Sequence, residues 1–190
     1  MKAYIMMGSL RKNGNTAQLL ECLVAEMDEI NVEHKTVWLK DKDISSCVAC
    51  CACQNYHDGF GCPIKDDMHG IFEDILESDL IVIATPIYSW YCTAPVKIAL
   101  DRLVYGMNKF YGAERGKALW QGKKLALLTT CGYSVGKGPD LWEEGMKRYT
   151  KHSKLEYLGM LAERDFGYKA TFMDDAKAEN ARAFAREICG

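Results

Sequence analysis

The chain has 190 residues, of which 48% are hydrophobic and 26% are charged, the balance expected for a globular protein with one sizeable core. The net charge of -2 leaves no basic excess to bind a phosphate backbone, so we expect no nucleic acid partner. The longest apolar runs are too short to span a bilayer, and the first residues lack the features of a secretory signal. We therefore expect a cytoplasmic protein with no membrane partner.

Short apolar runs rich in β-branched residues alternate along the chain with longer amphipathic stretches. The runs predict strands at residues 3–7, 35–39, 80–85, 124–130 and 155–161. The amphipathic stretches predict helices at residues 16–27, 68–77, 95–105, 141–152 and 174–189. The near-continuous apolar character of the strands suggests that both of their faces are buried.

Strands separated by helices indicate right-handed βαβ units, and hence an α/β domain with a parallel five-stranded sheet between two helical layers. We expect residues 1–190 to form one such domain, with a cysteine-rich loop at residues 47–62. Ligands bind such sheets at the carboxyl ends of the strands. The loops that follow the strands are therefore the first places to look for a site.

The loop at residues 8–16 joins the first predicted strand to the first predicted helix. Glycine at positions 8 and 14 permits unusual backbone angles, and the free N–H groups of the following helix point back into the loop. Polar or cationic side chains occupy most other positions, so the loop suits a terminal phosphate. The candidate residues are Ser9, Arg11, Lys12, Asn13, Gly14, Asn15 and Thr16.

Three other phosphate sites do not fit this loop. A dinucleotide fingerprint needs G-x-G-x-x-G, and a P-loop needs lysine where Asn15 follows Gly14. A low-molecular-weight phosphotyrosine phosphatase needs a cysteine nucleophile, which the loop lacks. An ordinary N-capped turn remains the structural alternative.

Two further loops follow the third and fourth predicted strands. The first contains a proline and then aromatic residues, which offer flat apolar surface beside a ring system, although they could instead cap the core or fill a dimer interface. The second offers small side chains and N–H groups near the same place. The candidate residues are Pro86, Ile87, Tyr88, Ser89 and Trp90 in the first, and Cys131, Gly132 and Tyr133 in the second.

Five of the nine cysteines fall between positions 47 and 62. Cys47, Cys50, Cys53 and Cys62 have the spacing C-x2-C-x2-C-x8-C, in which closely spaced thiolates could ligate several corners of a [4Fe–4S] cluster. Zinc, redox-active thiols and a vestigial loop remain alternatives. Cys51 lies outside this pattern.

Taken together, the loop at 8–16, the cysteine cluster, the segment 65–68, the segment 85–95 and the pair Asp101–Arg102 resemble the NAD(P)H-dependent FMN reductase superfamily. Within it the chain is most similar to the iron–sulfur flavoproteins, although its last cysteine gap is longer than expected for them. The resemblance implies a flavodoxin-like fold with strand order 2-1-3-4-5. It also implies a bound FMN, with its phosphate at residues 9–16 and its isoalloxazine along residues 86–90.

The resemblance further implies an oxidoreductase that passes electrons from NAD(P)H or a reduced ferredoxin through FMN, and through a [4Fe–4S] cluster, to a small-molecule or protein acceptor. The flavin would carry the chemistry, so no catalytic side chain is expected. A homodimer or homotetramer is expected. The alternatives are a non-catalytic flavin-binding electron carrier or sensor, and a metal-binding interaction module without flavin.

A few single residues carry smaller expectations. Asp66 and Asp67 are predicted to cap the second helix. Asp101 and Arg102 are expected to support a subunit interface. Three other cysteines lie on helix or loop patterns and are interpreted as small hydrophobic residues; they are Cys22, Cys92 and Cys189.

Overall fold

A computed structural model describes residues 1–167 and 169–190 and contains a parallel five-stranded sheet in the order β2-β1-β3-β4-β5. The strands are β1 (Lys2–Met7), β2 (Glu33–Trp38), β3 (Leu80–Pro86), β4 (Lys124–Cys131) and β5 (Glu156–Arg164). The α-helices are α1 (Asn15–Glu29), α2 (Met68–Glu77), α3 (Ala94–Met107), α4 (Asp140–Ser153) and α5 (Asp175–Cys189). Two short 3-10 helices, η1 (Leu39–Asp41) and η2 (Ala52–Asn55), lie between β2 and α2.

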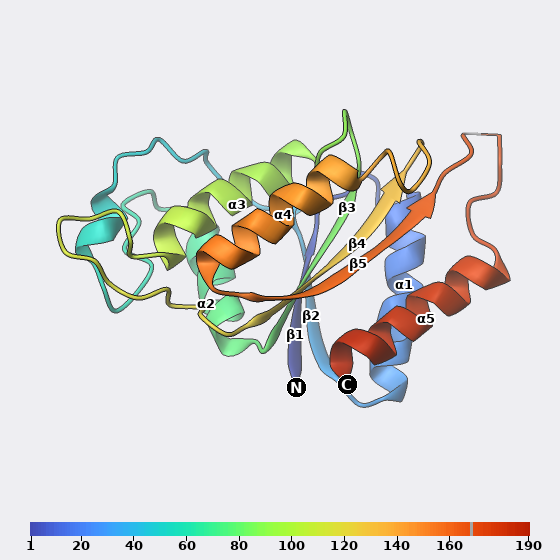
Figure 1. The fold of residues 1–190 in the computed structure, drawn as a ribbon, viewed down its shortest axis with the longest axis horizontal. Helices are drawn as coiled ribbons and strands as arrows, with labels where there is room; N and C mark the ends of the chain where they lie inside the picture. The colour runs from blue at the N-terminus through green and yellow to red at the C-terminus, as the bar shows by residue number, and fades with distance from the viewer. Residues whose placement is uncertain (168) are drawn as a thin grey trace.

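The sheet lies between two helical layers, with α1 and α5 on one face and α2, α3 and α4 on the other (Figure 1). Alternate residues of β1 enter opposite layers, as the pleat of a strand requires. Ala3, Ile5 and Met7 pack with α1 and α5, whereas Tyr4 and Met6 pack with α2 and α3. The predicted three-layer α/β/α fold and the strand order 2-1-3-4-5 are confirmed.

The carboxyl ends of the central strands lie together at one end of the sheet. Met7 lies opposite Ala84, and Ala84 lies opposite Leu128, so β1, β3 and β4 reach this edge in register. The backbone N–H of Gly8 donates to Ala84 O at 2.8 Å, which ties the loop after β1 to β3. The three loops predicted to hold a ligand therefore leave the sheet side by side.

The helices match their predicted ranges to within two residues at each end, but the two edge strands differ from expectation. In β2, Val37 is buried and the other residues are exposed or half-buried, and β5 is half-buried along most of its length. The expectation of burial on both faces was therefore wrong for these strands, because an edge strand has a neighbour on only one side. Within the described ranges, no helix combines the length and apolar character needed to cross a bilayer.

The cysteine-rich segment leaves the sheet after η1 and returns at α2. It lies beyond the carboxyl end of α3, at the left of the molecule in Figure 1, and η2 contacts α3. The first turns of α3, in contrast, follow the loop after β3. Helix α3 therefore connects the edge where the strands end to the cysteine-rich segment.

Candidate functional site

The loop after β1 ends at a helix whose first N–H groups are open. Gly14 is the N-cap of α1 and makes no side-chain hydrogen bond into the helix. It has no side chain with which to satisfy the N–H groups of the first turn, and the positive end of the helix dipole lies behind them. This arrangement fits a phosphate, since an anion supplies the acceptors that the helix lacks.

Small hydroxyl side chains line the inner side of the same loop. Ser9 is buried, and its Oγ accepts a hydrogen bond from the backbone N–H of Arg11 at 3.2 Å. Thr16 Oγ1 and Thr130 Oγ1 share a buried hydrogen bond of 2.7 Å, which joins the start of α1 to the end of β4. The loop is therefore held in place from two sides.

The cations of the loop lie in different directions. A Cβ placed on Gly14 would lie 3.3 Å from Nε of Arg11, so the Arg11 side chain lies against the start of α1. Lys12 instead forms an ion pair with Asp41 of η1, and its Nζ lies 4.5 Å from the centre of the Trp38 ring. Arg11 is thus the better placed of the two to neutralise a bound phosphate.

The loop after β3 forms a tight hairpin. The backbones of Tyr88 and Tyr91 exchange two hydrogen bonds, and Ser89 and Trp90 between them have positive φ angles of 50° and 65°. Two consecutive residues in this region are typical of a type I′ turn, in which asparagine and glycine are the usual occupants. The hairpin projects beyond the sheet and exposes its aromatic side chains.

The loop after β4 meets this hairpin through an aromatic stack. Trp90 and Tyr133 stack with ring centres 5.4 Å apart and an angle of 13° between their planes, although both rings remain substantially exposed. Cys131 is buried at the end of β4, and burial raises the pKa of its thiol. Gly132 is exposed, and a Cβ added there would meet no atom of the described residues within 4 Å.

Gly8 lies where the first two loops approach most closely. Its carbonyl accepts a hydrogen bond from Thr93 Oγ1 at 2.8 Å. A Cβ at this position would overlap the Val96 side chain and lie 2.9 Å from Thr93 Oγ1. Only glycine fits here without moving α3, so the edge of the sheet is closely packed.

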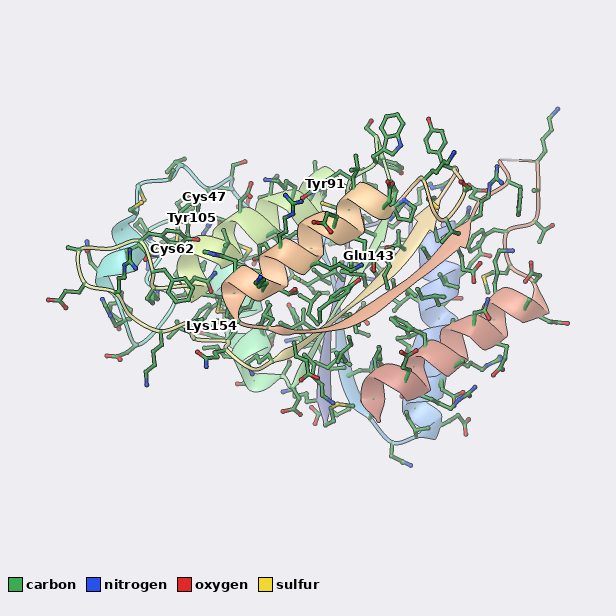
Figure 2. The ribbon with its side chains drawn as sticks, viewed as in Figure 1. Cys47, Cys62, Tyr91, Tyr105, Glu143 and Lys154 are labelled. Atoms are coloured by element: carbon green, nitrogen blue, oxygen red, sulfur yellow. The ribbon has the colours of Figure 1, made fainter. Side chains whose placement is uncertain are left out.

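The predicted cluster ligands Cys47, Cys50, Cys53 and Cys62 all line one small cavity of about 20 Å³. Cys51, Arg102 and Tyr105 line it too, and Figure 2 shows Cys47, Cys62 and Tyr105 at the same end of the molecule. Within the described residues, no three His, Cys, Asp or Glu side chains are arranged to hold a metal ion. The thiols share a site, but in this arrangement it has room for about one water molecule.

Arg102 of α3 lies at the base of the cysteine-rich segment. Its guanidinium forms a buried ion pair with Asp66, at 2.7 and 3.1 Å, and donates to Ser45 O at 2.8 Å. Its Nη2 also lies 3.3 Å from Sγ of Cys62. Burial favours the neutral acid, but hydrogen bonds from Arg102, Ser45 and Met68 hold the pKa of Asp66 below its usual value.

Lys109 is a second buried cation in this region. Its Nζ donates to Cys53 O at 3.0 Å and to Phe60 O at 3.2 Å, and desolvation lowers its pKa. Nearby, the buried Gln54 amide donates to Tyr105 O and Asn108 O at 2.5 and 3.0 Å. The sequence predicted neither contact, because a lysine and a glutamine in a loop ordinarily face solvent.

The smaller expectations had mixed outcomes. Asp66 Oδ1 accepts from the Met68 N–H as a cap, whereas Asp67 binds the Asp43 N–H instead. The support of a subunit interface by Asp101 and Arg102 stays a prediction, and within the single chain the Arg102 side chain is 1% exposed and pairs with Asp66. Cys92 is buried, and desolvation raises the pKa of its thiol to about 12, as expected of a small hydrophobic residue.

Relatives with similar sequences match about half of the residues of this chain. An iron–sulfur flavoprotein of Archaeoglobus fulgidus is 33% identical over 107 residues, which are 56% of this chain and 47% of the relative. Another, from Methanosarcina thermophila, is 33% identical over 104 residues, which are 55% of this chain and 53% of the relative. The chain therefore matches about half the length of these relatives.

Solved structures with the same fold cover nearly the whole chain. An azoreductase from Bacillus anthracis matches 98% of this chain and 99% of its own, with a TM-score of 0.68 and 17% identity. An NAD(P)H:quinone oxidoreductase from Methanothermobacter marburgensis matches 98% of this chain and 95% of its own, with a TM-score of 0.68 and 18% identity. The family model described as NADPH-dependent FMN reductase matches residues 1–139. The chain therefore belongs to the NADPH-dependent FMN reductase family.

Proposed function

We propose that residues 1–190 form one FMN-binding domain whose flavin phosphate binds in the loop at residues 8–16. The observation that carries this proposal is the uncapped start of α1 beside the buried hydroxyls of Ser9 and Thr16. The main-chain N–H groups and these hydroxyls would donate to the phosphate oxygens, and Arg11 would neutralise their charge. Asn13 and Asn15 would add amide donors, whereas Lys12 would act at longer range because Asp41 already pairs with it.

The isoalloxazine would lie along the two loops that follow β3 and β4. Pro86, Ile87, Tyr88 and Ser89 would line its edge, and Trp90 and Tyr133 would cover its plane after their present stack opens. Backbone N–H groups near Cys131 and Gly132 would stabilise negative charge on the reduced ring. When bound, FMN supplies the redox chemistry by accepting a hydride from NAD(P)H and releasing electrons to an acceptor.

We propose that Cys47, Cys50, Cys53 and Cys62 ligate a [4Fe–4S] cluster. Four thiols around one cavity are the donor set that such a cluster requires. Cys50 is exposed and Cys47 and Cys62 are partly exposed, and the loop would have to open outward to enlarge the cavity before a cluster could bind. The name of the A. fulgidus and M. thermophila relatives supports the same assignment.

The exposed end of the proposed flavin site suggests which molecules would react or associate there. A nicotinamide from NADPH or NADH would stack on the open flavin face, and a small molecule, a ferredoxin or another redox protein would exchange electrons there. The exposed rings of Tyr88, Trp90 and Tyr133 suit a homodimer or homotetramer contact beside the flavin. All nine cysteines are unpaired thiols, which suits the reducing cytoplasm.

Anaerobic purification and reconstitution with FMN, iron and sulfide test both assignments. The expected result is one FMN per chain, flavin absorption bands with a broad iron–sulfur shoulder, and four iron atoms per chain. A protein that stays colourless with excess FMN would end the flavin assignment. A flavin spectrum without iron would end the cluster assignment alone.

Reduction by nicotinamide separates the enzyme from a flavin-binding electron carrier or sensor. When NADPH or NADH is added without air, the absorption bands of the oxidised flavin should bleach. A quinone or azo dye added afterwards should restore them. A holoprotein that dithionite bleaches but neither nicotinamide bleaches would be a carrier or sensor.

A further inference from the structure

A groove of about 640 Å³ lies between the edge strand β2 and helix α2, and residues of both elements line it. A volume of this size is typical of sites for small organic molecules. Of the residues that the structure describes, those that line the groove include no cysteine and no residue proposed to hold the flavin. The groove is therefore a candidate site separate from the two described above.

The lining of this groove is acidic. Five carboxylates and two lysines line it, so negative charges are in excess by three. Asp67 and Glu73 are the two carboxylates that form no ion pair within the described part of the chain. Nowhere among the described residues are three acidic, His or Cys side chains arranged to hold a metal ion. The groove therefore favours an organic cation over a metal.

Tyr4 of β1 adds a buried polar group at the inner wall of the groove. The residue is 1% exposed, and its hydroxyl has no hydrogen-bond partner within the described ranges. Burial raises the pKa of Tyr4, and the charge of the nearby Asp74 carboxylate raises it further. Because Asp74 also lines the groove, the hydroxyl end of Tyr4 lies on the groove side. The hydroxyl stays neutral and offers an unused acceptor to an N–H group.

Lys35 of β2 shows how an ammonium group fits at this place. Lys35 lies opposite Tyr4 in the pairing of β2 with β1, so the two side chains share one face of the sheet. Its Nζ lies 2.6 Å from Oδ1 of Asp74. The Lys35 side chain is 57% exposed, and such exposed pairs contribute little free energy, so Lys35 can turn toward solvent at little cost. A ligand ammonium can then take its place beside Asp74.

We propose that the groove between β2 and α2 binds a primary amine with a short apolar body. The ammonium of the ligand replaces that of Lys35 beside Asp74 and donates to the Tyr4 hydroxyl. The apolar body packs on the side chains of Val37 and Ile71, which are buried and line the groove. Gly70 of α2 leaves room for it, because a Cβ added there would meet no described atom within 4 Å.

Ligand-observed NMR titrations of the full chain at neutral pH test the proposal with 2-phenylethylamine, and 2-phenylethanol serves as the uncharged probe of similar shape. The amine should bind at least about tenfold more tightly than the alcohol, since hydrogen bonds between charged groups are the stronger ones. Tyr4→Phe keeps the ring and should weaken the amine roughly fivefold. Gly70→Leu fills the groove from α2 and should abolish binding, so it serves as a second variant should Tyr4→Phe fold poorly.

A pair of lysine variants separates this site from a general attraction of cations. Lys35→Met removes the competing ammonium and should tighten the amine roughly threefold. Lys97→Met makes the same change of charge in α3, where it frees Asp101 from an exposed pair, and should leave the affinity unchanged. Equal tightening in both variants would overturn the proposal, since the net charge of the chain would then attract the amine. Equal affinities for the amine and the alcohol, or full binding in Gly70→Leu, would overturn it as well.

Discussion

The loop at residues 8–16, which we propose binds the flavin phosphate, and the cysteine-rich segment are held in place by different kinds of contact. Residues 8–16 are held by main-chain hydrogen bonds, a glycine and hydroxyl groups, and they begin where a central strand ends. Residues 45–66 have little regular structure and are held by the buried charges of Arg102, Asp66 and Lys109. One site is positioned by the fold itself, whereas the other is positioned by side chains that the fold must bury.

The difference has an energetic consequence. Backbone donors at a helix start need no partner other than the ligand, so we expect the loop at residues 8–16 to keep the same shape with and without FMN. Buried charges depend on one another, and the loss of one leaves its partner unpaired in the interior. We therefore expect the cysteine-rich segment to be the more sensitive region to a single substitution.

The largest effect should come from Arg102→Met. This change leaves the Asp66 carboxylate buried without its cation and should lower the free energy of unfolding by about 3–5 kcal/mol. Urea denaturation measures it. The control is Arg148→Met, which breaks an exposed pair with Glu144 and should cost no more than about 0.5 kcal/mol. Equal losses in the two variants would contradict the proposed asymmetry between buried and exposed pairs.

A smaller loss is expected at the phosphate loop from Gly8→Ala. The new Cβ would overlap the side chain of Val96, and such overpacking costs about 1–3 kcal/mol. The displacement of the loop should also weaken FMN binding in a fluorescence titration. Gly70→Ala in α2 is the matched control, because a Cβ there meets no described atom within 4 Å. If Gly8→Ala is as stable as wild type, then Val96 and α3 can move away from the new Cβ at little cost, and the close packing at Gly8 is not important for stability.

The Asp66 pair should also make the chain sensitive to acid. Hydrogen bonds from Arg102, Ser45 and Met68 hold the pKa of Asp66 below its ordinary value of 3.8, so its stabilisation is present above that pH and is lost as the pH falls through the lower, folded-state value. Urea unfolding should therefore separate wild type from Asp66→Asn at about pH 7, and the gap should shrink at about pH 3. A gap that stays constant with pH would exclude this carboxylate as the cause.

The smallest expected effect is at Cys51, and it distinguishes the proposed cluster ligands from this additional thiol. Cys50 and Cys51 are adjacent and both exposed. Cys50→Ala should lose most of the iron after reconstitution, whereas Cys51→Ala should keep it, since only the first belongs to the C-x2-C-x2-C-x8-C set. Iron and sulfide counts per chain measure the difference. Loss of iron in Cys51→Ala alone would reassign the ligand set.

The fold could be predicted closely because its patterns are local. Helix α2 begins and ends at the predicted residues, Met68 and Glu77, where an apolar face coincides with a capping aspartate. The strand order came from the resemblance and was then found in the sheet. The exposure of β2 was missed, although the order 2-1-3-4-5 places this strand at an edge and its residues Glu33, His34 and Lys35 are polar.

The sequence could predict only those parts of the candidate site whose position follows from the order of strands and helices along the chain. The loops after β1, β3 and β4 follow from the fold, and they lie together as expected. The direction of Lys12 toward Asp41, the stack of Trp90 on Tyr133 and the burial of Lys109 depend on contacts between distant segments. No local pattern in the sequence records these contacts.

The central claim is that the loop at residues 8–16 binds the phosphate of FMN, and riboflavin, which lacks that phosphate, tests it most directly. Fluorescence titrations should find FMN bound at least about 100-fold more tightly than riboflavin by the wild-type chain. Asn15→Asp should remove most of this preference by placing a negative charge at the start of α1, where an acidic residue does not harm the helix. Gln121→Glu makes the same charge change just before the amino end of β4, at the other end of the strands. This variant should preserve the preference for FMN. Equal affinities for FMN and riboflavin, or an undiminished preference in Asn15→Asp, would contradict the account.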